Sequence, residues 1–183
     1  NLNGIWAGEP SYILKNNGDD TFESIKLEFE GLDGPLDTYF HGATAGDING
    51  DGLVDLFVVD VTNDWNLGGI YALLNQGNFQ FEKDTSWIAP ETKNNISIEL
   101  IDLDEDGTLE LLVGGGDEAD TNQATLIYKL EGQSFELWKQ IPSVSDRGVI
   151  LDFVYRKELC STCVYVHRTA DFNSGSFYAS ITI

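Results

Sequence analysis

The sequence predicts an all-β fold, in the form of a propeller-like array of about four blades with repeats of about 55 residues. Three observations indicate it: short β-rich runs bounded by Gly and Asp, the absence of any sustained helical spacing, and a nine-residue acidic motif that occurs twice. Nineteen glycines divide the 183 residues into short pieces, as expected for strands joined by tight turns. The apolar content of 42% and aromatic content of 11% are those of a globular chain.

The charge balance is strongly acidic. Asp and Glu total 31 against 10 Lys and Arg, which gives a net charge of −21. Such a chain repels phosphate backbones and anionic membranes, so no nucleic-acid partner is expected. No apolar run approaches the roughly 18 residues of a membrane span, and no membrane insertion is expected. Two bound calcium ions would bring the net charge only to about −17, so metal accounts for part of the excess.

Strands are predicted from the β-rich runs, and hairpins from segments in which an aromatic–aliphatic strand precedes an Asn/Gly turn. The predicted strands are 53–59, 109–113, 124–128 and 177–183, and the predicted hairpins begin at 12–18, 71–77 and 128–132. Strand 177–183 is a candidate to complete the first repeat, in the same chain or in a neighbouring copy. Gly114–Gly116 are expected to let chains pass closely between blades.

Two anchors separated by the same offset define the repeat. Residues 47–55 match residues 102–110 at an offset of 55, and Gly77 matches Gly132 at the same offset. We expect one domain with repeats at 1–36 (partial), 37–90, 91–141 and 142–183 (degenerate). In the degenerate unit, an alignment of 149–152 on 99–102 places the remaining ligand positions on Val154, Arg156 and Cys160, so no metal loop is expected there.

The repeated motif, D-x-[DN]-x-D-G-x-x-[DE], predicts two calcium loops. Calcium takes about 6–8 oxygen ligands, and oxygen side chains at alternate positions of one short loop supply most of them. The glycine at position 6 suits a sharp turn. The predicted ligands, including the backbone carbonyl at position 7, are Asp47, Asn49, Asp51, Leu53 and Asp55 in the first loop and Asp102, Asp104, Asp106, Thr108 and Glu110 in the second. The second loop has four acidic ligands against three in the first, so we expect it to bind calcium more tightly.

Two alternatives compete with the interpretation of these segments as calcium loops. An EF-hand requires Glu at position 12 and flanking helices, whereas position 12 is Val58 or Val113 and the flanks read as strands. A turn capped by Asp and Asn without any ion is the second alternative. It is disfavoured because it would crowd several carboxylates together without a cation.

Gly46–Leu56, followed by Tyr71–Gly77 and Phe79, resembles the FG-GAP/VCBS repeats of integrin-α-type β-propellers. The resemblance covers residues 37–140 well, 1–36 partly and 142–183 poorly. It implies four-stranded blades, with the calcium loop joining the first two strands and helping to fix one blade against the next. Many such propellers have seven blades. The array would therefore be a small closed propeller, a fragment of a larger one, or an incomplete array finished by another chain.

The resemblance and the loops predict a calcium-binding extracellular structural or interaction module, not an enzyme. Its partners would be a protein or glycan ligand, or neighbouring copies that pair through exposed strand edges. A carbohydrate-binding lectin is the alternative, with Trp65 as the candidate ligand contact. A polysaccharide lyase or hydrolase is less expected, because the chain has two histidines and no G-x-S-x-G motif.

The two cysteines, Cys160 and Cys163, form a C-x-x-C pair. The favoured interpretation is a disulfide that closes a hairpin turn. The alternatives are free thiols, a metal site or a redox site. A disulfide would fit an oxidising, extracellular setting. Asn95–Ile96–Ser97 matches the N-glycosylation pattern, and whether it is used is left open.

Overall fold

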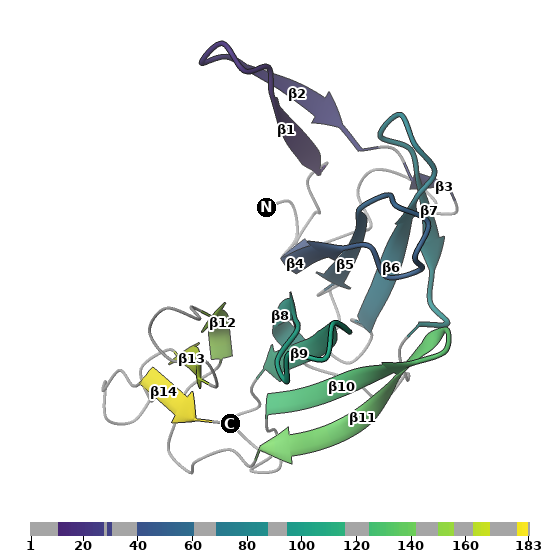
Figure 1. Ribbon diagram of the computed structural model, residues 1–183. Coiled ribbons are helices and arrows are strands. Elements are labelled where there is room, and N and C mark those ends of the chain that lie inside the picture. The colour runs from purple at the N-terminus through teal and green to yellow at the C-terminus, as the bar shows by residue number, and fades with distance from the viewer. Residues whose placement is uncertain are drawn as a thin grey trace, which may run out of the picture.

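The computed structural model describes residues 11–27, 29–30, 40–60, 69–87, 95–115, 125–141, 150–155, 163–168 and 179–182. Within these ranges the chain forms fourteen strands in four separate sheets, with no helix and no closed barrel (Figure 1). This confirms the all-β class and is compatible with incomplete propeller-like blades. Among the described residues, no helix has the length and apolar character that crossing a bilayer requires.

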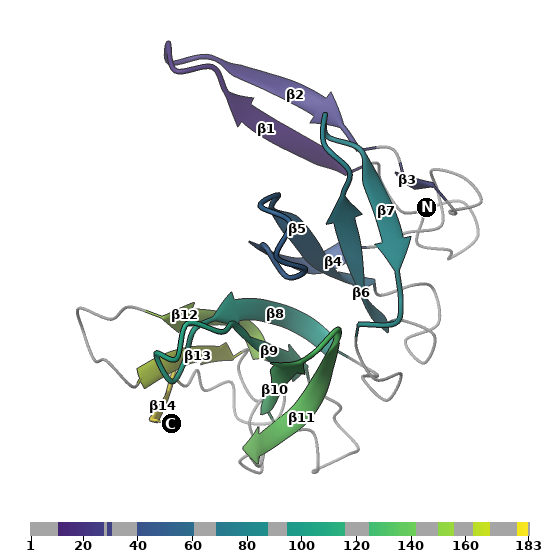
Figure 2. The ribbon, with the colours of Figure 1, turned by 45° about the vertical axis from the view of Figure 1, so that its right-hand side comes forward.

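The first sheet is a two-stranded hairpin of β1 (Tyr12–Asn16) and β2 (Phe22–Lys26). Its turn includes Gly18 at φ 82° and Asp20 at φ 64°, as an Asn/Gly turn requires. The hairpin projects from one end of the molecule in both views (Figures 1 and 2). It confirms the hairpin predicted from residues 12–18.

The next two sheets have the same antiparallel arrangement of four consecutive strands. The second sheet contains β4 (Phe40–Gly46), β5 (Asp55–Asp60), β6 (Gly69–Asn75) and β7 (Phe81–Asp84), with β3 (Phe29–Glu30) added in parallel to β7. The third contains β8 (Asn95–Ile101), β9 (Glu110–Gly115), β10 (Thr125–Glu131) and β11 (Ser134–Ile141). The β6–β7 and β10–β11 turns carry Gly77 and Gly132 at positive φ, which confirms both predicted hairpins.

The fourth sheet has the order β12 (Ile150–Tyr155), β13 (Cys163–Arg168) and β14 (Ala179–Thr182). β14 pairs antiparallel with its chain neighbour β13, so the prediction that strand 177–183 completes the first repeat of its own chain is wrong. Consecutive strands pair more readily than distant ones, because the chain between them is short.

The alignment chosen for the degenerate repeat is also wrong. It required a loop to begin at Asp152, but β12 continues to Tyr155 and Phe153 is buried with 4% of its surface exposed. β12 is therefore a continuous strand, and the Phe153 side chain packs into a buried apolar cluster. The proposed ligand positions at Arg156 and Cys160 lie outside the described residues.

Apolar clusters join neighbouring sheets. Phe57 of β5 and Phe135 of β11 meet edge to face at 5.3 Å between ring centroids, within one buried cluster. A second cluster joins Leu112 of β9 to Ile150 and Phe153 of β12. Gly114 lies at this junction, where a Cβ atom would come within 2.7 Å of Ile150 Cγ2, which confirms its predicted role in close passage between sheets.

Candidate metal centre

The two acidic loops occupy equivalent places in their sheets. The first connects β4 to β5 and the second connects β8 to β9, so each joins the first two strands of its sheet, as the resemblance implied. The residue at position 2 is apolar and buried in both loops, with 4% exposed for Ile48 and 6% for Leu103. The start of each loop is therefore fixed to the core, while positions 3–5 face solvent.

The two loops also share backbone conformation. Positions 4 and 6 have positive φ in both: Gly50 at 77° and Gly52 at 86°, then Glu105 at 61° and Gly107 at 89°. Glycine adopts this region without steric cost, whereas Glu105 does so against its Cβ. Alternating left-handed residues curl the backbone into a concave loop, so the sequence repeat is also a structural repeat.

In the first loop the predicted ligands hold the curl by local hydrogen bonds. Asp47 accepts the N–H groups of Gly50 at 2.8 Å and Gly52 at 3.0 Å. Asn49 accepts the N–H of Asp51 at 2.9 Å and donates its amide to the Asp51 carboxylate at 2.9 Å. These bonds keep the first loop curled, and joint coordination of one ion by Asp47, Asn49 and Asp51 stays a prediction.

Asp55, at position 9, is fully buried and ties the loop to the sheet. Its Oδ2 accepts the N–H of Ile48 at 3.2 Å, and its Oδ1 accepts the N–H of Asn75 at 2.8 Å. The Asn75 side chain donates in turn to the Val54 carbonyl at 2.9 Å. Burial raises the pKa of Asp55, and the two N–H donors oppose that rise.

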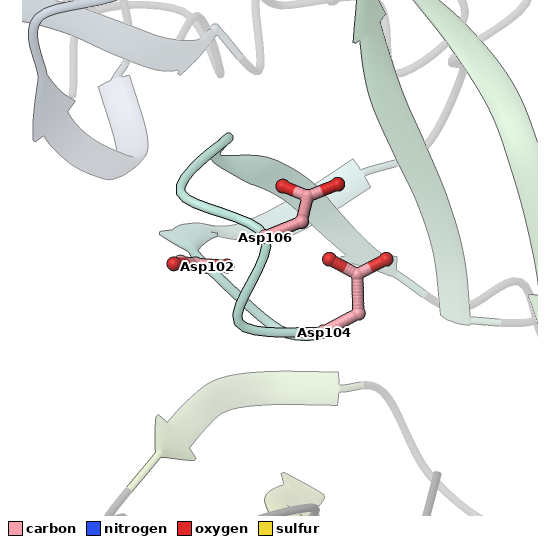
Figure 3. Close-up of side chains that lie close together, drawn as sticks. All are labelled: Asp102, Asp104 and Asp106. Atoms are coloured by element: carbon pink, nitrogen blue, oxygen red, sulfur yellow. The ribbon is translucent and has the colours of Figure 1, made fainter.

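The second loop repeats this pattern. Asp102 accepts the N–H of Gly107 at 3.1 Å, and Glu110 accepts the N–H of Leu103 at 2.7 Å. Oxygen atoms of Asp102, Asp104 and Asp106 all lie within 4.8 Å of one another. Figure 3 shows the carboxylates of Asp104 and Asp106 on the same side of the loop.

The donor set of the second loop fits calcium. Two oxygens bound to one calcium ion at about 2.3–2.6 Å each can be up to about 5 Å apart, which the Asp102–Asp104–Asp106 spacing satisfies. Asp102 Oδ1 and Glu110 Oε1 are buried and have no hydrogen-bond partner. A buried carboxylate oxygen without a donor is costly unless a cation compensates it. The Lys129 ammonium lies 3.7 Å from Glu110 Oε1. Asp102 Oδ1 is therefore the atom that indicates a place for a further cation.

Position 7 is Leu53 in the first loop and Thr108 in the second. The Leu53 N–H donates to Asp51 at 2.7 Å and the Thr108 N–H to Asp106 at 2.8 Å. These contacts fix the backbone at position 7 equivalently in the two loops. Calcium coordination by the backbone carbonyl oxygen at position 7 stays a prediction. The predicted strand 53–59 starts two residues too early, because β5 begins at Asp55 and Leu53 belongs to the loop.

Sequence reasoning missed Lys129. Its Nζ lies 2.5 Å from Asp104 Oδ2, 3.4 Å from Asp106 Oδ2 and 3.7 Å from Glu110 Oε1. The hydrogen bond to Asp104 raises the pKa of this lysine, with a further contribution from Asp106 against the opposing effect of burial. A signal was present, because the repeat offset of 55 aligns Lys129 with Leu74 and so marks a charge that one repeat has and the other lacks.

An open cavity of about 780 Å³ lies beside the second loop, between β8 and β12. Four acidic residues contribute to its lining: Glu99, Asp102, Glu105 and Asp152. Burial, and after it the negative charge of Asp152, raises the pKa of Glu99. The negative charge of the loop therefore extends into the adjoining cavity.

The remaining predicted residues have mixed outcomes. Trp65 lies outside the described residues, so its ligand contact stays a prediction. Cys163 is disulfide-bonded, and the only other cysteine of the chain, Cys160, lies outside the described part. Asn95 is 8% exposed within β8, a position that does not suit a glycan acceptor in the folded chain.

Residues 47–113 match the family model of the FG-GAP-like repeat. This segment begins at the first position of the first loop, includes both loops, and ends within β9. No curated protein matches the chain. The match confirms the resemblance over the segment that contains both acidic loops, and the chain thus carries an FG-GAP-type repeat.

Proposed function

We propose that the chain is a calcium-binding interaction module of the adhesion or scaffold type, in which calcium rigidifies the β-repeats. The FG-GAP-like repeat over residues 47–113 supports a β-repeat interaction module. The proposed role is binding rather than catalysis. Its partner would be a protein or glycan ligand, or a neighbouring copy.

One observation carries the calcium proposal: the second loop brings three aspartates together, and one of their oxygens, Asp102 Oδ1, is buried without a hydrogen-bond partner. Oxygen-only donors at this spacing favour a hard cation. The first loop has the same positive-φ positions and the same position-9 carboxylate that accepts the N–H of position 2. Both loops are therefore proposed to hold one calcium ion each.

Three considerations support an extracellular location for this module. The disulfide at Cys163 is of a kind that persists in oxidising compartments. Millimolar calcium outside cells would fill loops of modest affinity, of the kind found in extracellular modules. The net charge of −21 also favours a soluble, well-hydrated surface.

The test is calcium titration by isothermal calorimetry, with the metal-stripped chain and with magnesium as the comparison ion. We expect two calcium sites, of which Asp51→Ala removes one and Asp104→Ala the other. Glu23→Gln is the matched control, since Glu23 is an exposed acid on β2 that pairs with Lys15, far from either loop.

Thermal unfolding gives a second readout of the same proposal. A ligand that binds only the folded state stabilises it by about 2.7 kcal/mol at a hundred times its dissociation constant. Millimolar calcium should therefore raise Tm for the wild type and for Glu23→Gln, and raise it less when either loop is mutated. An unchanged heat signal and an unchanged Tm in millimolar calcium would refute the proposal.

A further inference from the structure

Lys129 places a fixed positive charge at the second acidic loop. It lies on β10 directly opposite Glu110 of β9, and its ammonium reaches over the loop. Its contacts at 2.5, 3.4 and 3.7 Å go to Asp104, Asp106 and Glu110, three of the four predicted acidic ligands. The ammonium therefore lies where these carboxylates converge.

Within the described part of the chain, no ion pair joins a lysine or arginine to the acids of the first loop. The residue 55 positions before Lys129 is Leu74 on β6, an aliphatic side chain packed against the core cluster. Asp55, the counterpart of Glu110, has both oxygens engaged by backbone N–H donors, whereas Glu110 Oε1 has none. The two loops thus share a backbone design but differ in how their negative charge is balanced.

Lys129 also changes the comparison of ligand charges, on which the second loop was expected to bind calcium more tightly than the first. One ammonium against the four acidic ligands leaves three net negative charges among the ligand groups of the second loop, the same number that Asp47, Asp51 and Asp55 supply in the first; Glu105 is a fifth acid of the second loop, outside the ligand positions. Counting acids alone favoured the second loop. Once Lys129 is included that advantage disappears, and an ion must in addition displace the ammonium from Asp104 and Asp106.

Trp138 provides a place to which the ammonium can move. The Lys129 Nζ lies 4.5 Å from the centroid of the Trp138 ring, so it contacts an aromatic face while it contacts the loop. Lys139 lies over the same ring at 4.0 Å. A short movement of Lys129 would free the carboxylates and keep the ammonium on the ring.

We propose that Lys129 competes with calcium for the carboxylates of the second loop. Its ammonium and a calcium ion exclude one another at Asp104 and Asp106. The second loop then binds calcium more weakly than the first and keeps its folded form without metal. The first loop is the tighter site, because an ion that enters it need not displace the ammonium of Lys129. This inference rests on the proposed calcium function.

The test measures calcium affinity one loop at a time, by calorimetry with calcium chloride alone. The Asp51→Ala chain reports the second loop, and the Asp104→Ala chain reports the first. Lys129→Met is introduced into the Asp51→Ala chain, because methionine keeps an apolar stem without the charge. Lys139→Met is the matched control, since it removes a charge from the same tryptophan ring, and among the described residues Lys139 forms no ion pair with the loop.

We expect Lys129→Met to tighten calcium binding by about tenfold or more, since it removes ion pairs and a repelling charge a few ångströms from the metal. Lys139→Met should change affinity by less than about twofold, because an exposed charge at greater distance is screened. In chelator, Lys129→Met should lower Tm, because the acids then repel one another without compensation.

A variant that adds a lysine at the equivalent position of the first loop tests the inference independently of whether the Lys129→Met chain folds well. Leu74→Lys in the Asp104→Ala chain should weaken calcium binding at the first loop by about tenfold. The inference is overturned if Lys129→Met leaves the affinity unchanged or weakens it, or if the second loop binds at least as tightly as the first in chains that retain Lys129. If no chain binds calcium at either loop, the proposed function fails and the inference fails with it.

Discussion

Gly114 marks the closest approach between the third and fourth sheets, and a single methyl group there tests how tightly they are packed. A Cβ added at Gly114 would lie 2.7 Å from Ile150 Cγ2 and 2.8 Å from Phe153 Cζ. Carbon atoms in favourable contact are about 3.5–4.0 Å apart, so each neighbour must move by roughly 1 Å. Ile150 is fully buried and Phe153 is 4% exposed, so neither has free space into which to move.

Overpacking of this kind costs about 1–3 kcal/mol. At about 2–4 °C per kcal/mol for a chain of this length, Gly114→Ala should lower Tm by roughly 2–12 °C. The assay is urea unfolding with parallel thermal melts, both at saturating calcium so that the metal loops do not contribute to the difference. The loss should appear as a lower urea midpoint with an unchanged slope.

Gly69→Ala is the matched control for this prediction. Gly69 also lies in a strand, has no positive φ, and has nothing within 4 Å of an added Cβ. Any gain from reduced backbone freedom in the unfolded chain is common to both variants and cancels in the comparison. If Gly114→Ala and Gly69→Ala agree within about 0.5 kcal/mol, the tight junction between β9 and β12 is refuted.

Two further predictions concern the surroundings of the second loop. Glu105→Gly should raise the unfolding free energy by about 0.5 kcal/mol, because it relieves the steric strain of Glu105 at φ 61°, and this relief exceeds the entropic cost of ordering a glycine. Glu105→Gln keeps the strain and should not raise the unfolding free energy. The raised pKa of Glu99 means that the folded chain holds this proton more strongly, so its contribution to stability is present at low pH and is lost as pH rises through and above 4.5. Urea unfolding in chelator should therefore show Glu99→Gln gaining stability over the wild type between about pH 4 and about pH 7; a constant difference across this range would contradict the assignment.

The repeated parts of this chain could be predicted from the sequence because local rules determine them. The Asp, Asn and Gly spacing fixes the loop backbone through hydrogen bonds to the nearest N–H groups, such as Gly52 to Asp47. The same applies to the hairpins, where glycine supplies positive φ at Gly77 and Gly132. The close passage at Gly114 followed from its missing side chain.

The parts that depend on partners distant in sequence could not be predicted this way. The pairing of β14 with β13 is a choice between sheet edges, and no local pattern specifies an edge. The repeat alignment placed Lys129 opposite Leu74, but an alignment does not show that a side chain reaches across to Asp104. The alignment of Asp152 with Asp102 failed because the sequence of that repeat lacks the acidic motif that would fix the register.

Asp55 determines how far the effect of a bound ion reaches into the fold. Asp47, Asn49 and Asp51 are exposed and bond mainly to their own loop, whereas Asp55 is buried and accepts the N–H of Asn75, twenty residues away on β6. An ion held by Asp55 therefore restrains the end of β6 as well as the loop.

Hydrogen exchange measured by NMR tests this coupling. We expect calcium to slow exchange at the Asn75 and Ile48 amides together, since both donate to Asp55. Asp55→Asn should abolish the slowing at both amides, whereas Asp47→Asn should weaken calcium binding and leave the Asn75 amide protected at saturating metal. Calcium protection confined to residues 48–53 would show that the ion acts only on the loop, and that the buried carboxylate does not transmit its effect to the sheet.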